Sequence, residues 1–331
     1  MHPAGHWLLI IVVLLLPGVN LGLMTTQTHM ARAPFFALLL GMLAVATAPP
    51  LILLADIPPF ALAAWRLLCV ALLLLPFVAG AIRRDLKKLS GRELTYLLAS
   101  GVLYGVHFGL FNLAFAHTTK ESVVVLLGAQ PLMAAAVGAL WLNEKITRVM
   151  LAASMLAIGG LLIFAWHDYT FDASNLVGDA LVLACGLAIV LSYSAGRKLR
   201  PRMSLRGYLG ALYLIGGATC LLSALIAGDA LFGYARHQWS WLLAAILIPT
   251  LVGHSLFHYV VKYVPVFYVN LTILGEPILA LLMMYLLRER FAVFRESSLT
   301  PLQIVGGLML LVGVGIGLLS GRKPQLSEAS V

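Results

Sequence analysis

Residues 270–286 read NLTILGEPILALLMMYL, an apolar run long enough to cross a bilayer, with Glu276 and Pro277 near its centre. An ionised carboxylate at the middle of a membrane helix costs roughly 2.5–3.5 kcal/mol on insertion scales. A proline at such a place breaks the helix and frees backbone polar groups, which are tolerated only where protein or a cavity covers them. The stretch therefore predicts a broken membrane helix beside a buried polar site.

A second stretch of the same kind occurs earlier in the chain. Residues 128–142 read GAQPLMAAAVGALWL and place Gln130 and Pro131 in an equally apolar run. Two breaks formed by a polar residue and a proline, in two similar segments, predict a repeated fold with a site at its centre.

The composition indicates an all-α integral membrane protein that crosses the bilayer many times. Of the 331 residues, 61% are hydrophobic and 11% are charged, whereas roughly 25% are charged in a soluble domain. The net charge of +9 does not indicate a nucleic-acid partner, because the basic residues lie in short loops between apolar runs. Membrane lipid is the expected surrounding partner.

Apolar runs of about 20 residues predict ten transmembrane helices. They cover about 35–55, 60–82, 94–116, 122–142, 149–166, 176–196, 207–227, 239–261, 265–287 and 301–320. Sixteen of the 22 lysines and arginines fall on one side of these spans, five fall on the other, and Arg66 lies within a span. This distribution predicts a multi-pass protein of the cell (inner) membrane, with both ends of the ten-span unit in the cytoplasm.

An additional apolar segment lies at the N-terminus, at residues 7–24. It could be an eleventh span, a signal-like sequence or the product of an overlong start, since Met24 and Met30 both precede the first span closely. Its first six residues contain no lysine or arginine, which a signal sequence would carry. We favour a segment without a role in the mechanism, and expect residues 1–29 to be dispensable.

The two halves of the chain resemble each other. Residues 126–146 align with 271–291, and residues 109–119 align with 255–265, which pairs Asn112 with His258. Each half has five spans, and an odd number inverts the second half relative to the first. The expected organisation is two inverted five-helix repeats at 33–168 and 169–321, between an N-terminal extension, 1–32, and a cytoplasmic tail, 322–331.

Five segments carry a resemblance to a known family: IPPFALAAWRL (57–67), VHFGLFNLAFAHTT (106–119), the Pro131 segment ending in LNEK, VGHSLFHYVVKYVPVFYVNLTILGEP (252–277) and TPLQIVGG (300–307). Together they resemble the EamA-like family of the drug/metabolite transporter superfamily. The resemblance covers about 33–320 and implies a ten-span exporter of amino acids and other small metabolites. Two features depart from the family pattern: FAVFRESSL (291–299) resembles an insertion, and Arg288-Glu289-Arg290 stands where Gly-Glu is typical.

The polar residues within the spans are the candidate substrate or proton pathway. Glu276 could hold a substrate amine or exchange a proton, because intramembrane acids are functional by default, while a structural helix cap is the alternative. Gln130 could line a pore or form a packing amide. Arg66 could attract a carboxylate, pair with an acid such as Glu121, or extend its charge to the interface.

Three histidines and three further residues complete this set. His254 and His258 are four residues apart and share a helix face with Lys262. Together with His107, these histidines either form a polar face of a cavity or are packing histidines whose hydrogen bonds are satisfied. No acid or third ligand follows at zinc spacing, so no metal site is expected. Asn112 continues the small-residue row of Gly101, Gly105 and Gly109, which is typical of close helix packing. Tyr104 and His107 lie on the opposite face and are preferred for the cavity, and Asn270 lies beside the second break.

No catalytic motif is present, and no cofactor is expected: the chain contains no Walker loop, GxSxG, HExxH or CxxC. The sequence therefore favours a secondary transporter of small polar metabolites, with proton coupling as an option, working by alternating access between two repeats. An integral-membrane enzyme acting on lipid, a channel and a non-transporting membrane partner are the alternatives. The oligomeric state stays open.

Overall fold

The computed structural model describes residues 32–321 except 115, 119, 167–174, 296 and 298. The expectations for the N-terminal extension and the C-terminal tail concern residues outside this range. Within it, ten helical segments are long and apolar enough to cross a membrane, and the described chain contains no strand. The prediction of an all-α protein with ten transmembrane spans is therefore confirmed.

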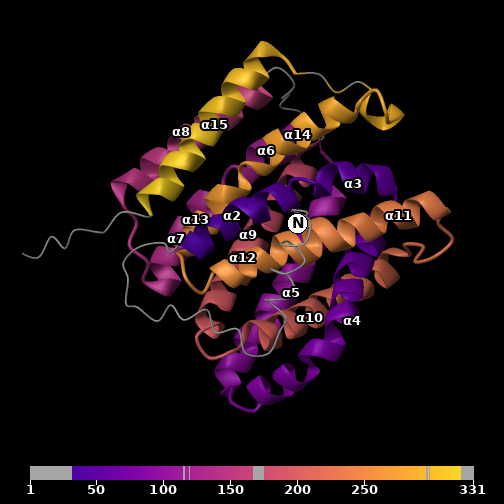
Figure 1. The fold of residues 1–331 in the computed structure, drawn as a ribbon, viewed down its shortest axis with the longest axis vertical. Coiled ribbons are helices and arrows are strands. Elements are labelled where there is room, and N and C mark those ends of the chain that lie inside the picture. Colours follow the sequence, from indigo (N-terminus) through magenta and orange to yellow (C-terminus); the bar gives the residue numbers. More distant parts are fainter. Residues whose placement is uncertain are drawn as a thin grey trace, which may run out of the picture.

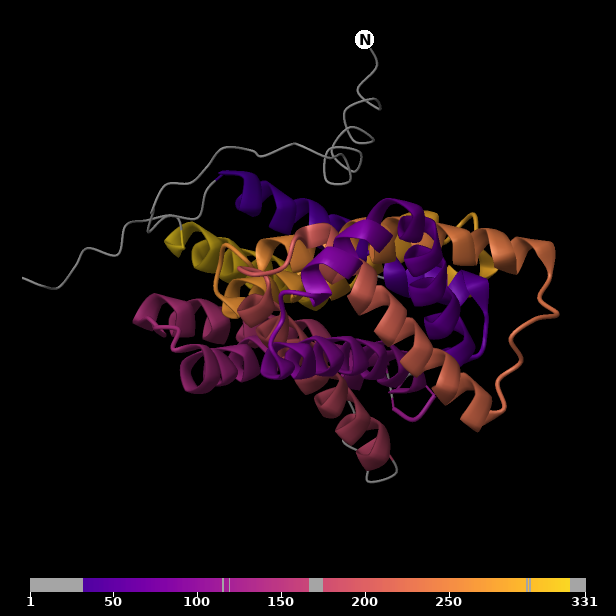
Figure 2. The same ribbon diagram turned by 90° about the horizontal axis from the view of Figure 1, so that it is seen from below.

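The helices follow one another with short connections, as Figures 1 and 2 show. In the first half they are α2 (Arg32–Val45), α3 (Ala48–Ala55), α4 (Pro59–Leu86), α5 (Gly91–Ala114), α6 (Lys120–Leu127), α7 (Gln130–Leu142) and α8 (Arg148–Ala165). In the second half they are α9 (Leu176–Leu199), α10 (Leu205–Ala227), α11 (Arg236–Ala245), the π-helix η2 (Ile246–His254), α12 (Ser255–Val260), α13 (Val266–Ile273), α14 (Glu276–Leu287), the short 3₁₀-helix η3 (Ala292–Phe294) and α15 (Pro301–Ser320).

The fourth and ninth spans are broken in the same way. Each consists of an eight-residue half-helix, α6 or α13, then two turn residues, then a second half-helix, α7 or α14. Pro131 and Pro277 are the second residues of α7 and α14. A proline suits the first turn of a helix, because the N–H that it lacks would find no partner within the helix there. The predicted breaks at both prolines are confirmed.

The eighth span contains a π-helical segment, η2, between α11 and α12. Pro249 lies within it and has no N–H to donate to the preceding turn. The hydroxyl of Thr250 donates instead to the carbonyl of Ala245 over 2.8 Å. The wider turn changes the direction in which Thr250 and His254 face, which matters for the cavity described below.

Most close helix pairs join one helix of the first half to one of the second. α4 packs along α10, and α8 along α15, at opposite ends of the molecule in Figure 1. Between them α5 packs on α9, α2 packs on η2 and α12, and α7 packs on α13. Such reciprocal pairing is consistent with two halves related by a twofold axis.

At each end of the pair formed by α4 and α10, a carboxylate of one helix or its flanking residue caps the N-terminus of the other. Oδ2 of Asp85, near the end of α4, accepts from the backbone N–H of Ser204 at 2.8 Å, immediately before α10. Oδ2 of Asp229, just after α10, accepts from the N–H groups of Phe60 and Ala61 at 2.9 and 3.1 Å in the first turn of α4. Each helix thus supplies an acid near the other's N-terminus, where unpaired N–H groups and the helix dipole favour negative charge.

Glycines permit the closest helix contacts. A Cβ on Gly105 of α5 would lie 2.6 Å from the carbonyl oxygen of Gly216 in α10, and one on Gly313 of α15 would lie 2.6 Å from the backbone N of Ala157 in α8. Neither position has room for a larger residue. The small-residue row on α5 therefore packs against a neighbouring helix, as the spacing predicted.

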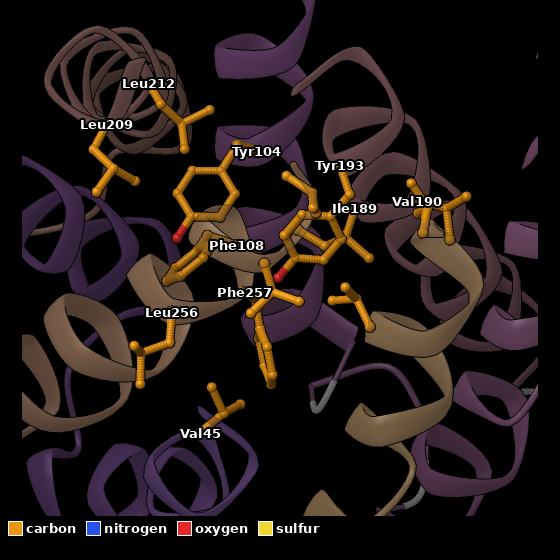
Figure 3. Close-up of a cluster of buried hydrophobic side chains, with 14 of the residues drawn as sticks. Val45, Tyr104, Phe108, Ile189, Val190, Tyr193, Leu209, Leu212, Leu256 and Phe257 are labelled. Carbon is orange, nitrogen blue, oxygen red and sulfur yellow. The ribbon is translucent and has the colours of Figure 1, made fainter. Parts of the chain in front are cut away.

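The centre of the bundle is aromatic. Tyr104, Tyr193 and Phe257 are fully buried, and Phe108 nearly so, between α5, α9, α10 and α12 (Figure 3). The rings of Tyr104 and Phe108 are 4.9 Å apart at their centroids, in an edge-on arrangement that aromatic pairs prefer. Phe108 and Tyr193 of this cluster line the cavity that holds the candidate site.

Candidate substrate site between the broken helices

A buried cavity of about 40 Å³ lies at the centre of the bundle, beside both broken spans. Such a volume accommodates water molecules, since one water needs about 10–15 Å³ by this measure. Five residues expected from the sequence line this central cavity: Arg66, His107, Gln130, His254 and Glu276. They come from five elements, α4, α5, α7, η2 and α14, so the fold brings together residues as far as 210 positions apart in sequence.

A second, larger cavity of about 230 Å³ adjoins the first. Gln130 and Glu276 line both cavities, as do Phe111, Leu127 and Ile273. Apart from Gln130, Glu276, Asn112 and Gln303, its lining is apolar. It extends toward the helix ends at loops 56–58 and 288–300. We name it the outer cavity, and we call the side of the molecule with these loops the opposite side. We name the other side, with loops 87–90, 143–147, 200–204 and 261–265, the basic side.

Gln130 and Glu276 are the first residues of the half-helices α7 and α14. Gln130 is 2% exposed, and its Oε1 has no hydrogen-bond partner within the described chain. Gly186 of α9 makes room for it, since a Cβ there would lie 3.1 Å from Cγ of Gln130. Glu276 is half-buried and faces both cavities. The two helix breaks thus aim an amide and a carboxylate into one space.

Arg66 lies on the other side of the central cavity and is only 2% exposed. Its Nε donates to Oγ1 of Thr250 over 3.0 Å, and its guanidinium lies 4.6 Å from the ring centroid of Phe108. The guanidinium and the Glu276 carboxylate interact electrostatically, yet no ion pair within 4 Å joins these two described residues. Because the charge is buried, the interpretation that Arg66 reaches the membrane interface does not fit. The side chain of Glu121 lies outside the described part of the chain.

The three histidines occupy different surroundings. His107 lines the central cavity, and its Nδ1 lies 3.1 Å from the carbonyl oxygen of Cys185. His254 also lines it, and its Nδ1 has no partner within the described chain. His258 lies one turn further along, outside both cavities, with Nδ1 3.3 Å from the hydroxyl of Tyr208. Lys262 follows the end of α12 and is exposed. No group of three His, Cys, Asp or Glu suited to a metal occurs in the described residues.

The remaining candidates lie around the cavities rather than together. Tyr104 lines neither cavity, but its ring contacts those of His254 and His258, with centroids 5.7 and 5.0 Å apart. Asn112 lines the outer cavity and donates to the carbonyl of Pro59 over 3.0 Å. Asn270 is fully buried in α13, lines neither cavity, and donates to the carbonyl of Val266 over 2.9 Å.

Two residues of the site were absent from the sequence prediction. Thr250 orients Arg66, and it does so from the π-helix that Pro249 induces. Tyr193 lines the central cavity and is fully buried, with a hydroxyl that has no partner in the described part of the chain. Unpaired buried polar atoms are uncommon and call for water or a ligand. Three of them surround this cavity, on Gln130, Tyr193 and His254.

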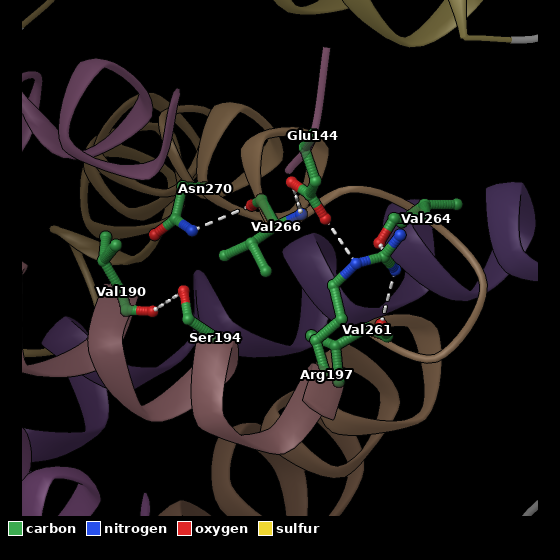
Figure 4. A network of polar contacts seen from close by, with 8 residues as sticks. All are labelled: Glu144, Val190, Ser194, Arg197, Val261, Val264, Val266 and Asn270. Carbon is green, nitrogen blue, oxygen red and sulfur yellow. Dashed lines mark hydrogen bonds and ion pairs between the residues drawn. The ribbon is translucent and has the colours of Figure 1, made fainter. Parts of the chain in front are cut away.

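The basic side of the molecule is closed. No residue of the four basic-side loops lines either cavity. There Glu144, two residues beyond α7, forms an ion pair with Arg197 near the end of α9 (Figure 4). Glu144 also accepts from the backbone N–H of Val266 at the start of α13 over 3.2 Å. Nη1 of Arg197 donates to the carbonyls of Val261 and Val264, at 2.9 and 2.6 Å. We call Glu144, Arg197 and these three backbone groups the basic-side latch.

The basic-side latch joins the two halves of the chain, and its net contribution to the stability of this contact is modest. Burial raises the pKa of Glu144, and the Arg197 guanidinium opposes that shift. Desolvation of the carboxylate is therefore the larger effect, as is common for buried ion pairs. A contact of this kind fixes one arrangement of the two halves without making it irreversible.

Comparison with known proteins agrees with this architecture. Residues 32–166 match the EamA-like transporter family. An "Uncharacterized transporter" of Archaeoglobus fulgidus is 27% identical over 225 residues, covering 68% of this chain and 76% of the relative. The "Uncharacterized transporter YdeK" of Bacillus subtilis is 32% identical over 165 residues, covering 49% of this chain and 52% of the relative.

A crystal structure shares the fold with a TM-score of 0.70 at 15% identity, covering 88% of this chain and 99% of that chain. The expectation of a non-enzymatic, multi-pass membrane transporter is confirmed by the family match and by the names of both relatives. Over residues 32–166 the chain is similar to the EamA-like transporter family, and the two relatives that it resembles are both named transporters.

Proposed function

We propose that this transporter carries amino-acid-like zwitterions, as a secondary exporter working by alternating access. The observation that carries the proposal is that a basic side chain, Arg66, and an acidic one, Glu276, line one cavity without a direct ion pair between them. Buried charges without partners are costly. A substrate carboxylate at Arg66 and a substrate ammonium at Glu276 would compensate both charges at once.

The surrounding groups suit such a substrate. The unpaired polar atoms of Gln130, Tyr193 and His254 could hydrogen-bond its head group. The central cavity is small, so the remainder of the substrate would occupy the adjoining outer cavity of about 230 Å³. When no substrate is bound, Glu276 could instead take up a proton, which would couple transport to a proton gradient.

The closed basic side supports alternating access. Both cavities lie beyond the basic-side latch, and the larger one extends toward the opposite side. In the inner-membrane orientation expected from the positive-inside rule, the basic side would face the cytoplasm, and this arrangement would be the outward-facing state of the proposed cycle. Rupture of the latch would let α13 and α7 separate and admit substrate from the cytoplasm.

The test is flux through the Glu276→Gln variant in proteoliposomes. Loss of one hydrogen bond to a charged group costs about 1.5–3 kcal/mol, which corresponds to roughly 10–100-fold weaker transport. Glu93→Gln, the same change at a carboxylate bonded to Ser90 on the basic side, is the matched control and should transport normally. Wild-type flux in Glu276→Gln, at normal folded yield, would exclude the proposed role of this carboxylate.

A further inference from the structure

The two broken spans are built alike but packed differently. On the basic side, α7 packs against α13, and seven of the eight residues of α13 are buried. On the opposite side, the corresponding half-helices α14 and α6 make no comparable contact. The outer cavity lies between them, with Leu127 of α6 and Met284 of α14 both in its lining. Only Ala280 of the twelve residues of α14 is buried within the protein, so fewer contacts hold this half-helix than hold α13.

The acids that follow the two half-helices differ in the same way. Glu144 is the second residue after α7, and Glu289 is the second residue after α14. The Glu144 side chain is 8% exposed and engaged in the basic-side latch. The Glu289 side chain is 88% exposed, and the one ion pair that it forms within the described chain is with its neighbour Arg288, whose Nε lies 3.4 Å from Oε1 of Glu289. One acid therefore joins the two halves of the chain, while its counterpart is exposed and paired with its sequence neighbour.

The repeat indicates where Glu289 would bind. Glu144 accepts from the N–H of Val266, which is the first residue of α13. The first residue of the corresponding half-helix α6 is Lys120. A helix N-terminus favours a carboxylate because its N–H groups lack partners within the helix. Closure of the outer cavity would bring the start of α6 and the end of α14 together.

We propose that Glu289 is the second gate residue of this transporter. When the basic-side latch opens, α14 closes onto α6, the outer cavity disappears, and Glu289 binds the N-terminal turn of α6. Glu144 and Glu289 thus alternate, each closing one side of the membrane. This inference rests on the alternating access of the proposed function and on the division into repeats at 33–168 and 169–321, and it does not depend on the substrate.

Disulfide cross-linking tests the proposal, in full-length protein with Cys69, Cys185 and Cys220 replaced by alanine. The test pair is Glu289→Cys with Lys120→Cys, and the reference pair is Glu144→Cys with Val266→Cys. Arg295→Cys with Lys120→Cys uses the same loop and controls for chance collisions. Addition of Arg197→Gln, which weakens the basic-side latch, should raise cross-linking of the test pair by about thirtyfold and leave the collision control unchanged.

Alkylation of a Met284→Cys reporter in the outer cavity follows closure independently. Arg197→Gln should slow this alkylation, and further addition of Glu289→Ala should restore it. Two results would overturn the inference. If Met284→Cys becomes protected while the test pair does not cross-link, the cavity closes without Glu289. If Met284→Cys stays accessible when the latch is weakened, the outer cavity does not close at all, and alternating access fails with the inference. Solute flux tests the proposed substrate, and its outcome is independent of both of these results.

Discussion

Arg197→Gln is the variant expected to shift this transporter most strongly out of the observed state. The substitution removes the cation from the ion pair with Glu144, together with charged hydrogen bonds to the carbonyls of Val261 and Val264. The Glu144 carboxylate would then remain buried with the N–H of Val266 as its partner. The closed basic side should lose stability relative to an open one, in which water can reach the carboxylate.

The size of the effect follows from the exposure of the pair. Removing one partner of a fully buried ion pair costs about 3–5 kcal/mol. The Arg197 side chain is 25% exposed, and a glutamine amide can replace one hydrogen bond. We therefore expect a loss of about 2 kcal/mol, which is roughly a thirtyfold shift in population.

The assay is the alkylation rate of a cysteine placed at Ser194 in purified protein. Ser194 is fully buried in α9, where its hydroxyl donates to the carbonyl of Val190 over 2.7 Å. In Figure 4 it lies near Asn270 of α13, so separation of α13 from α9 would expose it. When opening is fast relative to labelling, the rate reports the population of the open state, and it should rise about thirtyfold.

The double variant Arg197→Gln/Glu144→Gln is the internal control. Replacing both partners removes the orphaned carboxylate, so most of the increase in alkylation should be lost. A rate within twofold of the parent in Arg197→Gln alone, with the protein folded, would refute the conclusion that this ion pair closes the basic side.

Three further predictions concern the scaffold and the chain start. Asp229→Ala should lower the stability of the purified protein by about 1 kcal/mol, seen as a lower melting temperature, because the first turn of α4 loses its cap; an unchanged melting temperature would show that water replaces it. Gly313→Ala should destabilise the packing of α8 on α15, whereas Gly315→Ala, where an added Cβ meets no atom within 4 Å, should not; equal melting temperatures for both would contradict the close approach. A chain that starts at Met30 should insert and transport normally, and loss of insertion would show that the N-terminal apolar run is needed.

Much of the architecture could be predicted because membrane spans are local features. Length and hydropathy alone mark a helix that must satisfy its own backbone in lipid, so ten spans appear close to their expected positions. The breaks before Pro131 and Pro277 were equally accessible, since a proline acts on the turn that contains it. The repeat then suggested that Gln130 and Glu276 meet, and both do line the same two cavities.

The partners of these residues could not be predicted from local patterns. Arg66 depends on Thr250, 184 residues away, and on a π-helix whose only sequence signal is Pro249. In the sequence, Arg197 was only one of the basic residues that indicate the orientation in the membrane. Its position near the end of α9, however, brings its side chain to Glu144. The predicted helix face was correct for only one of its two residues. His107 lines the central cavity, whereas Tyr104 does not line it and instead packs its ring against those of His254 and His258. Such pairings depend on tertiary packing, which cannot be read from residue spacing within one helix.

Solute counterflow into proteoliposomes loaded with unlabelled substrate tests most directly whether the cavity between Arg66 and Glu276 binds zwitterions for transport. The purified wild-type protein would be offered labelled amino acids, with nucleosides and sugars as controls. We expect saturable uptake of amino acids, and no uptake when either the amine or the carboxylate of the solute is blocked. Equal uptake of the blocked solutes, or folded protein that transports none of the amino acids, would contradict this expectation.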